Sequence, residues 1–323
     1  MLWVSVVVPT YRRPLLLRRC LDALLAQDLP REHYEILVAD DAADPETERM
    51  LGAMKRGRTG LPALRYVAVG PAHGPAAARN CGWRAARAPI IAFTDDDTAA
   101  HPAWLAEGLA ALARGAGAVW GRIEMPPARV TTDYSRDAAR LASAGFVTAN
   151  CFVRTQVLHL VGGFDERYTE AWREDSDLFF ALLAHGIEPV YAPRAAVVHP
   201  IRPAPWGVSL KQQRKIRFDA LLYKKYPALY RRYIRARPQW RYYAIVACLA
   251  ATLGGALARS PLVLAGAATV WIALTAAFFL DRLRGTTRAP AHVAEMLVTS
   301  CAIPPLAVFW RLVGALKFRS ALW

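Results

Sequence analysis

The first 200 residues alternate short apolar runs with amphipathic segments, which is the pattern of strands and helices that follow one another. Apolar runs, several of them rich in β-branched residues, predict strands at 2–8, 35–39, 64–69, 90–93 and 118–122. Apolar or small residues at helical spacing predict helices at 13–25, 45–54, 74–86 and 104–114. This repeated order predicts an α/β fold with a mostly parallel, doubly wound sheet and helices on both of its faces.

Residues 242–280 have a different pattern, since apolar side chains follow one another with almost no polar face. The segments 242–258 and 262–280 carry no charged residue, and each approaches the roughly 20 apolar residues that cross a bilayer core. The Arg-Ser-Pro break at 259–261 predicts a helical hairpin. The alternative, buried helices of a soluble domain, would require polar faces that these segments almost entirely lack.

A third apolar stretch at 293–310 differs from the other two, because it contains Glu295 and is interrupted by Pro304 and Pro305. A basic tail follows it at 311–319. A complete third span would place this tail outside the cell, against the preference of basic residues for the cytoplasmic side. We therefore expect a re-entrant or interfacial segment here.

The net charge of +15 is distributed unevenly along the chain. Residues 1–200 contain 22 basic and 23 acidic residues, whereas residues 201–323 contain 19 basic and 3 acidic ones. Within the second part, 201–241 holds 12 basic residues and one acid, directly before the apolar segments. Anionic lipid headgroups attract such a stretch by about 1 kcal/mol per basic residue. Nucleic acid is not an expected partner, because no nucleic-acid-binding motif accompanies the charge.

These patterns divide the chain into three parts. We expect an α/β domain at 1–200, a basic amphipathic interface region at 201–241 and a membrane region at 242–323. The basic residues on both flanks of the hairpin predict a cytoplasmic α/β domain at the cell (inner) membrane. The five cysteines are widely spaced without a CxxC pair, which fits a reducing compartment and argues against a disulfide framework or zinc site.

Three consecutive aspartates, Asp95, Asp96 and Asp97, directly follow the apolar run 90–93 and one threonine. Carboxylates crowded at the end of a buried strand repel one another, and a hard divalent cation with phosphate oxygens relieves that repulsion. Ligands of open α/β sheets bind at such strand ends. The other interpretation is a solvated acidic turn that caps the following helix. A second acidic pair, Asp40–Asp41, ends another predicted strand and favours the metal–nucleotide interpretation.

No Gly-rich phosphate loop follows the first strand, so a dinucleotide or P-loop site is not expected. Four segments nevertheless form a recognisable ordered set: VSVVVPTYRRP, ILVADDAAD, GPAAARNCGWRAARAPIIAFTDDDT and GGFDERYTEAWREDSDLFFALLAHG. Together they resemble the family 2 glycosyltransferases, over roughly residues 2–200. The resemblance implies the GT-A fold of nucleotide-diphospho-sugar transferases, with a doubly wound mixed sheet, and an inverting reaction.

The resemblance also implies which residues bind the donor. Pro9, Thr10 and Tyr11 would line the nucleobase pocket, and Asp41 would accept a hydrogen bond from the base, usually uracil. Arg79 would face the diphosphate. Considered without the resemblance, Tyr11 could equally pack on the sheet, and Arg79 could form a surface ion pair, as most arginines do.

In the same resemblance, Asp95 and Asp97 form the D-x-D pair of the family. Asp97 would be the main ligand of Mg2+ or Mn2+ and Asp95 its partner, while Asp96 would contact the sugar or ribose. His199 ends the strand-like run 195–198 and corresponds to a family histidine that faces the metal or diphosphate. By itself, a lone histidine is more often structural than a metal ligand.

A second acidic cluster, Glu174–Asp175, precedes an apolar helix expected at 178–183. Acids at a helix N-terminus are commonly explained by their favourable interaction with the helix dipole. The resemblance instead makes Asp175 the general base, which takes the proton from the acceptor hydroxyl. Glu174 would belong to the same catalytic pair and, with Trp172, would shape the acceptor pocket. One base without a covalent nucleophile implies inversion at the anomeric carbon.

The sequence therefore predicts a metal-dependent inverting glycosyltransferase anchored in the membrane. It would move a single sugar from a nucleotide-diphosphate sugar to a lipid or lipid-linked acceptor at the cytoplasmic membrane face. Residues 211–218 lack the spacing of the Q-x-x-R-W sequence found in processive members, which favours a single transfer. Two alternatives stay open: a nucleotidyltransferase, which would release pyrophosphate, and a non-catalytic membrane scaffold that binds nucleotide sugar.

Overall fold

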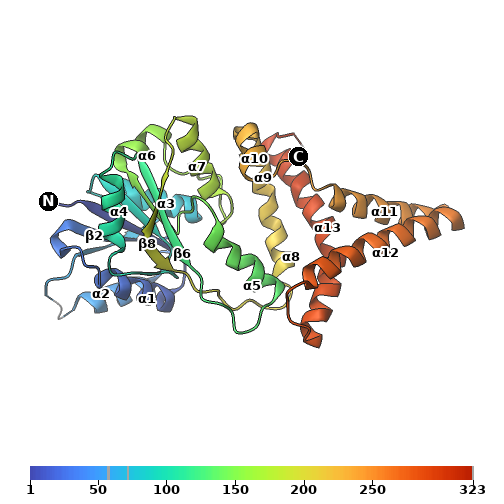
Figure 1. The fold of residues 1–323 in the computed structure, drawn as a ribbon, viewed down its shortest axis with the longest axis horizontal. Coiled ribbons are helices and arrows are strands. Elements are labelled where there is room, and N and C mark those ends of the chain that lie inside the picture. The colour runs from blue at the N-terminus through green and yellow to red at the C-terminus, as the bar shows by residue number, and fades with distance from the viewer. Residues whose placement is uncertain (57–58, 71–72, 322–323) are drawn as a thin grey trace. The chain divides into compact units, whose positions relative to one another are not determined.

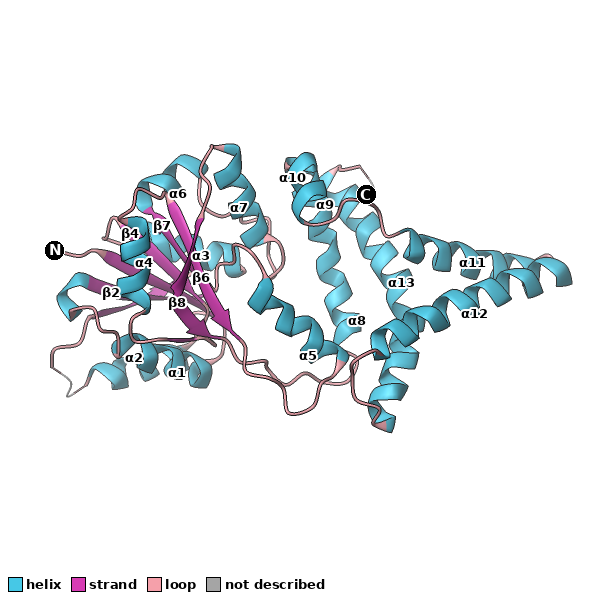
Figure 2. Cartoon of the chain, viewed as in Figure 1, coloured by secondary structure: helices cyan, strands magenta, loops and turns pink. Residues whose placement is uncertain are grey.

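The computed structural model describes residues 1–56, 59–70 and 73–321 (Figure 1). The chain divides into two compact units. The first contains residues 1–126 and 140–201, and the second contains residues 127–139 and 202–323. The first unit is built around a β-sheet, whereas the regular structure described in the second unit is helical (Figure 2).

Eight strands among the described residues form one mixed sheet in the first unit, in the order β3-β2-β1-β4-β7-β6-β8-β5. Their bounds are β1 Val4–Thr10, β2 Tyr34–Asp40, β3 Ala63–Ala68, β4 Ile90–Thr94, β5 Ala99–Ala100, β6 Ala118–Glu124, β7 Asn150–Arg154 and β8 Val190–Val198. The first four strands are parallel, as are β6 and β8, whereas β7 lies antiparallel between β4 and β6. The parallel half brings the carboxyl ends of β1, β2 and β4 to one edge of the sheet.

The helices of the first unit connect these strands. Their bounds are α1 Pro14–Leu25, α2 Pro45–Lys55, α3 Pro75–Ala85, α4 Trp104–Leu112, α6 Thr155–Val161 and α7 Glu174–Ala184. The first three helices each begin with proline, whose fixed φ suits the first helical position and whose missing N–H would have no partner there.

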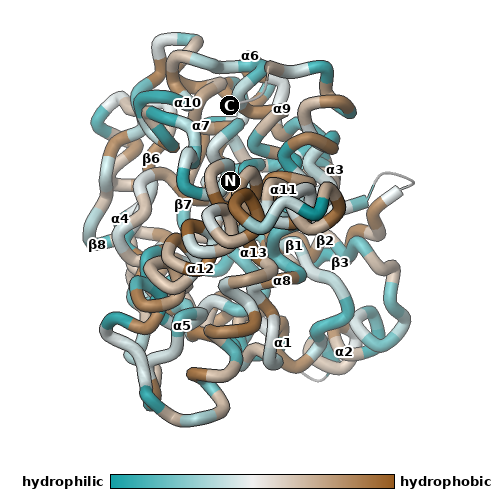
Figure 3. Tube along the Cα trace, turned by 90° about the vertical axis from the view of Figure 1, so that its right-hand side faces the viewer, coloured by the Kyte–Doolittle hydropathy of each residue, from teal (hydrophilic) through white to brown (hydrophobic). Residues whose placement is uncertain are grey.

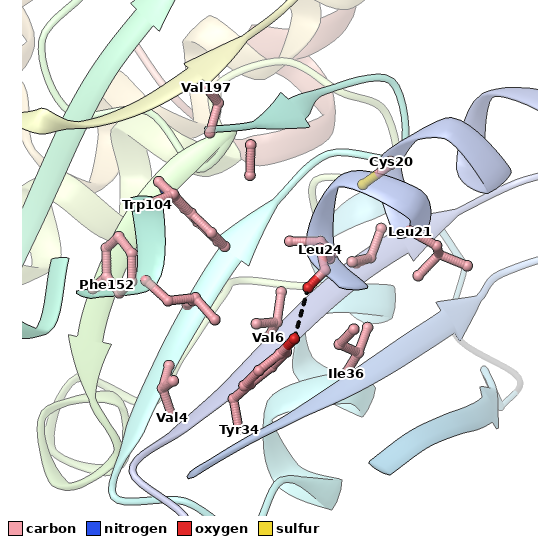
Figure 4. Close-up of a cluster of buried hydrophobic side chains, with 14 of the residues drawn as sticks. Val4, Val6, Cys20, Leu21, Leu24, Tyr34, Ile36, Trp104, Phe152 and Val197 are labelled. Atoms are coloured by element: carbon pink, nitrogen blue, oxygen red, sulfur yellow. Dashed lines mark hydrogen bonds between the residues drawn. The ribbon is translucent and has the colours of Figure 1, made fainter. Parts of the chain in front are cut away.

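The central strand β1 is buried on both of its faces because different helices cover them. Val4 and Val6 belong to the core cluster that includes Leu21 and Leu24 of α1 (Figure 4). Val7, on the other face of β1, meets α3 so closely that a Cβ added at Gly82 would lie 2.4 Å from its Cγ1 atom. The alternating residues of β1 thus hold one helix on each face of the sheet, as a doubly wound fold requires.

The strands and helices expected before residue 123 are all present, and no end differs from the expected one by more than two residues. The sequence did not predict β5 and β7. The sheet is consequently mixed, and its parallel half is followed by the antiparallel strand β7. The predicted α/β class with a doubly wound mixed sheet is confirmed by this topology.

The second unit consists of a group of short helices and three long ones. Their bounds are α5 Asp133–Ala138, α8 Val208–Gln212, α9 Arg217–Lys225, α10 Pro227–Tyr233, α11 Trp240–Leu257, α12 Pro261–Leu283 and α13 Pro290–Phe318. By length and composition, α11, α12 and α13 are each able to cross a membrane. α11 and α12 pack side by side as a hairpin, and the tube drawing shows their mainly apolar composition (Figure 3). α13 continues through Pro304 and Pro305 without a break.

A buried ion pair joins α5 to the end of the hairpin within the second unit. The Arg282 guanidinium donates to Asp133 Oδ2 at 2.8 Å through Nη2 and at 3.1 Å through Nε. Its remaining nitrogen, Nη1, donates to Thr299 Oγ1 at 2.6 Å and to Ser300 Oγ at 3.1 Å. An arginine buried at the end of an apolar helix is stabilised only when its donors are satisfied in this way.

Candidate active site

The acidic run after β4 forms a turn that hydrogen bonds hold in place. Thr98 Oγ1 donates to the carbonyl oxygen of Asp95 at 2.8 Å, and Thr94 Oγ1 donates to the carbonyl oxygen of Ala149 at 3.0 Å. The next helix, α4, begins after Ala103 and has no side-chain cap. The interpretation of the aspartates as a helix cap is therefore wrong, since the carboxylates do not cap this helix.

Asp95, Asp97 and His199 each place one ligand atom within 4.8 Å of the others. His199 lies just beyond the end of β8, where its backbone N–H donates to the carbonyl oxygen of Glu124 at 2.8 Å. Its Nε2 atom lies 3.5 Å from Asp97 Oδ1. Two carboxylates and one imidazole make an oxygen-rich donor set that suits Mg2+ or Mn2+ and leaves positions for phosphate oxygens. The residues that the sequence nominated as metal ligands are thus brought together.

Asp96 points away from this triangle, toward the end of β1. Thr10 Oγ1 donates to its Oδ2 at 2.8 Å, and Arg13 Nη1 lies 3.2 Å from its Oδ1. Burial raises the pKa of the Asp96 carboxyl, while Arg13 and Thr10 lower it. Asp96 therefore ties the D-x-D turn to the neighbouring strand, and its contact to sugar or ribose stays a prediction.

Arg79, on the buried face of α3, links the two acidic clusters. Its Nη2 donates to Asp95 Oδ1 at 2.7 Å, and its Nη1 donates to Glu174 Oε1 at 3.2 Å. Burial lowers the pKa of the guanidinium, but the charges of Asp95, Glu174 and Asp175 outweigh it and raise the pKa above the ordinary value. The ion pair is buried, so the surface alternative for Arg79 is wrong.

The second acidic cluster occupies the first turn of α7. Burial raises the pKa of the Glu174 carboxyl, although Arg79 lowers it. Asp175 follows on the same turn, and its Oδ1 accepts from the backbone N–H of Ser176 at 2.6 Å. Arg173, directly before the helix, has a left-handed backbone with φ of 74°, which costs a non-glycine residue free energy. A strained residue beside two acids is typical of a functional site.

Trp172 lies partly exposed beside this turn, with 37% of its surface accessible to solvent. The guanidinium carbon of Arg173 lies 4.6 Å from the centre of its ring. An aromatic ring in this position offers a flat apolar surface of the kind on which sugar rings or lipid chains can pack. The structure therefore places Trp172 next to Glu174 and Asp175 in space as well as in sequence.

The residues nominated for the nucleobase lie at the ends of β1 and β2. Tyr11 is half exposed, whereas Pro9 and Thr10 lie in β1, with Thr10 buried. Asp41 Oδ2 accepts from the backbone N–H of Gly74 at 3.0 Å, which joins the turn after β2 to the start of α3. Half of the Tyr11 surface stays accessible to solvent, so part of its ring is open to a ligand.

Asn80 is a buried structural residue beside Arg79 that the sequence did not reveal. Its carboxamide lies fully buried next to Arg79 and holds the backbone of Phe164 through both the N–H and the carbonyl group, at 2.9 and 2.8 Å. It also accepts from Trp83 Nε1 and donates to Glu166, both at 2.8 Å. The only available signal was its position beside Arg79, since hydrogen bonds between distant segments leave no local pattern.

Sequence models of two related families match the chain. The family described as "Glycosyl transferase family 2" matches residues 5–164, and the one described as "Glycosyl transferase family group 2" matches residues 90–280. The second match extends through the apolar hairpin as well as part of the sheet. Together they cover both acidic clusters.

The proteins similar to the chain include two curated glycosyltransferases and a solved structure. "Glycosyltransferase AglE" of Haloferax volcanii is 26% identical in an alignment of 232 positions, and the match covers 66% of this chain and 71% of that protein. "Validoxylamine A glucosyltransferase" of Streptomyces hygroscopicus is 27% identical over 250 residues, which cover 65% of this chain but only 56% of the relative. The chain thus spans little more than half of that second relative.

One similar solved structure is the mannosyltransferase PcManGT from Pyrobaculum calidifontis, in complex with GDP-Man and Mn2+. It aligns with a TM-score of 0.64 and 21% identity, over 98% of this chain and 86% of that one. At this level of identity the likeness establishes a common fold.

Proposed function

Since the chain belongs to the family 2 glycosyltransferases, we propose that it transfers a single sugar from a nucleotide-diphosphate sugar in a reaction that depends on a divalent cation. A uridine-diphosphate sugar is the favoured donor. The reaction inverts the configuration at the anomeric carbon. The acceptor is a lipid or lipid-linked molecule at the cytoplasmic membrane face.

The triangle of Asp95, Asp97 and His199 is the observation that carries this proposal. The three side chains would hold Mg2+ or Mn2+ next to the diphosphate, with Asp97 as the main ligand. The cation would offset the negative charge that grows on the departing nucleoside diphosphate. PcManGT was solved with Mn2+ and a nucleotide sugar, which supports a divalent cation in a protein of this fold.

Arg79 would contribute positive charge beside the diphosphate. It is held by Asp95 on one side and Glu174 on the other, so the side chain is positioned before the donor binds. A preorganised cation stabilises developing charge without reorganisation during the reaction. Pro9, Thr10, Tyr11 and Asp41 would bind the nucleobase at the neighbouring strand ends.

Asp175 would act as the general base. As the acceptor oxygen attacks the anomeric carbon, its hydroxyl proton passes to the Asp175 carboxylate and the bond to the diphosphate oxygen breaks. Glu174, held by Arg79, and Trp172 would position the acceptor. With one base and direct attack by the acceptor, the reaction inverts the anomeric configuration.

The membrane helices support a lipid or lipid-linked acceptor. α11 and α12 are apolar except near Arg241 and Asp281–Arg282, and only 11% of the residues in the most apolar window of each are buried within the protein. Such helices need an apolar environment outside the protein. An enzyme anchored in this way meets acceptors that are themselves confined to the bilayer. The basic residues on both flanks of the hairpin favour a cytoplasmic location for the first unit.

A donor screen tests this proposal. Purified protein would be heated with Mn2+ and each of a panel of uridine- and guanosine-diphosphate sugars, because a bound ligand raises the unfolding temperature. We expect a metal-dependent rise for at least one donor, and release of nucleoside diphosphate rather than pyrophosphate during turnover. Pyrophosphate as the product would identify a nucleotidyltransferase, and donor binding without turnover would identify a scaffold.

A further inference from the structure

The helix α13 differs from the other two long helices in how it packs. In its most apolar 18-residue window, 39% of the residues are buried within the protein, against 11% in α11 and in α12. One face of α13 is therefore covered by other parts of the second unit. A transmembrane helix at the edge of a small anchor would instead leave most of its residues uncovered by protein, as α11 and α12 do.

The segment from Gly207 to Tyr226 packs along α13 from one end to the other, and α11 and α12 contact α13 as well. The backbone N–H of Gly207, just before α8, donates to Glu295 Oε1 at 2.8 Å. At the other end, Lys224 Nζ of α9 donates to the carbonyl oxygen of Phe318 at 2.8 Å. Between these points a Cβ added at Gly314 would lie 2.3 Å from the carbonyl oxygen of Arg217, so the two backbones are in direct contact.

This covering segment is strongly basic. Between Gly207 and Tyr226 it carries Lys211, Arg214, Lys215, Arg217, Lys224 and Lys225, and its one acid, Asp219, lies 3.5 Å from the buried Arg311 of α13. Placing one arginine or lysine at the centre of a bilayer costs at least about 2.5 kcal/mol. If α13 crossed the membrane, the segment packed along it would bring several of these charges into the hydrocarbon.

The uncovered face of α13 is apolar. Its exposed large side chains are Leu297, Val298, Phe309, Leu312 and Leu316. At 3.6 residues per turn they fall within an arc of about 120°. The buried residues His292, Met296, Thr299, Ile303, Arg311 and Gly314 lie on the opposite side of the helix. An apolar stripe beside a basic segment is the pattern of a helix that lies in a membrane interface.

The direction of the hairpin indicates how the membrane normal is oriented relative to α13. Figure 1 shows α11 and α12 leaving the rest of the second unit across the direction of α13, not along it. If the hairpin crosses the bilayer, a helix that runs across the hairpin direction follows the membrane surface. The link between α12 and α13, residues 284–289, is short enough to keep the start of α13 near the end of the hairpin.

We propose that α13 is not a third membrane span but lies in the plane of the membrane. Its apolar stripe enters the boundary between headgroups and acyl chains, and the basic residues of α8, α9 and α10 bind the anionic headgroups around it. This placement rests on the proposed membrane anchoring by the hairpin. It also leaves the basic residues Arg311, Lys317 and Arg319 on the side of the membrane from which the hairpin enters.

Depth measurements on the full chain test this placement. The five native cysteines would be replaced, and single cysteines introduced at Val298, Phe309 and Leu316, all exposed on α13. A nitroxide label at each position reports depth through its collisions with oxygen and with a water-soluble nickel chelate. Control labels at Ile272, in the middle of α12, and Leu280, near its end, calibrate deep and shallow positions in vesicles of phosphatidylethanolamine and phosphatidylglycerol.

The two arrangements give different depth profiles. Val298 and Leu316 are separated by about 27 Å of helix, at 1.5 Å per residue. In the plane of the membrane, all three α13 labels lie at one shallow depth, close to that of Leu280 and well above Ile272. A label at Phe309 as deep as Ile272, or labels at Val298 and Leu316 near opposite surfaces, would overturn the proposal. A water-exposed Ile272 label would instead contradict the membrane anchoring itself.

Discussion

Three adjacent aspartates have three different surroundings at the residue scale. Asp95 contacts Arg79, Asp96 is buried against Thr10 and Arg13, and Asp97 faces His199. The sequence shows only that three acids follow a strand. Which of them faces the cation site depends on the direction that each side chain takes in the turn, and that direction is set by contacts with residues far away in the chain.

Asp175→Asn tests the general base at this scale. The amide keeps the shape of the side chain but cannot take the acceptor proton, so we expect turnover to fall by about 10²- to 10⁴-fold. Donor affinity, measured by thermal shift with Mn2+, should change little. Asp22→Asn is the matched control, because Asp22 forms an exposed ion pair with Arg18 on the surface of α1. Unchanged turnover in the Asp175 variant would remove it from the role of base.

Asn80→Ala tests the link between α3 and the loop that begins at Gly163. The substitution leaves the buried polar groups of Phe164 and Trp83 without their partner, at a cost of about 1–3 kcal/mol for each such group. We expect a lower unfolding temperature and a weaker response to the donor. Cys81→Ala, on the neighbouring half-buried residue, should leave both unchanged. A wild-type unfolding temperature for the Asn80 variant would contradict this account.

At the scale of elements, the sequence predicted those strands and helices that have a strong local pattern. β1, β2 and β4 consist mainly of apolar residues, and α1 has leucines at helical spacing. β7 was missed because its five residues, Asn150–Arg154, give a weak signal. Its antiparallel position depends on pairing with β4 and β6, which lie far away in sequence. Asn80 was missed for a similar reason, because its hydrogen bonds join segments that are distant in the sequence.

Alanine substitutions at two helical glycines separate the effect of tight packing from the effect of helix propensity. A Cβ at Gly82 of α3 would lie 2.4 Å from Val7 Cγ1, whereas nothing lies within 4 Å of one at Gly52 of α2. We expect Gly82→Ala to lower the free energy of unfolding by about 1–3 kcal/mol, because it overpacks the contact with β1. Gly52→Ala should raise it by about 0.5–1 kcal/mol through better helix propensity. Denaturant titration checks both, and equal effects would disprove the close packing of α3 on the sheet.

At the scale of the whole molecule, the chain combines a GT-A sheet with apolar helices. The charge pattern predicted a boundary near residue 200, where the excess of basic residues begins. The structure has a boundary between the units at 201–202. The second unit also includes residues 127–139, which the sequence did not set apart. The apolar hairpin could be predicted from composition, whereas the covered face of α13 could not, because it depends on packing with α9.

Sugar transfer to a membrane acceptor is the central claim. The most direct test measures nucleoside diphosphate release and glycosylated lipid with full-length protein in vesicles of membrane lipid extract, a panel of nucleotide sugars and Mn2+. We predict that at least one donor is consumed, that a chelator stops the reaction, and that Asp97→Asn lowers the rate by orders of magnitude. Failure to release nucleoside diphosphate from any donor, or full activity in the presence of the chelator, would contradict the account.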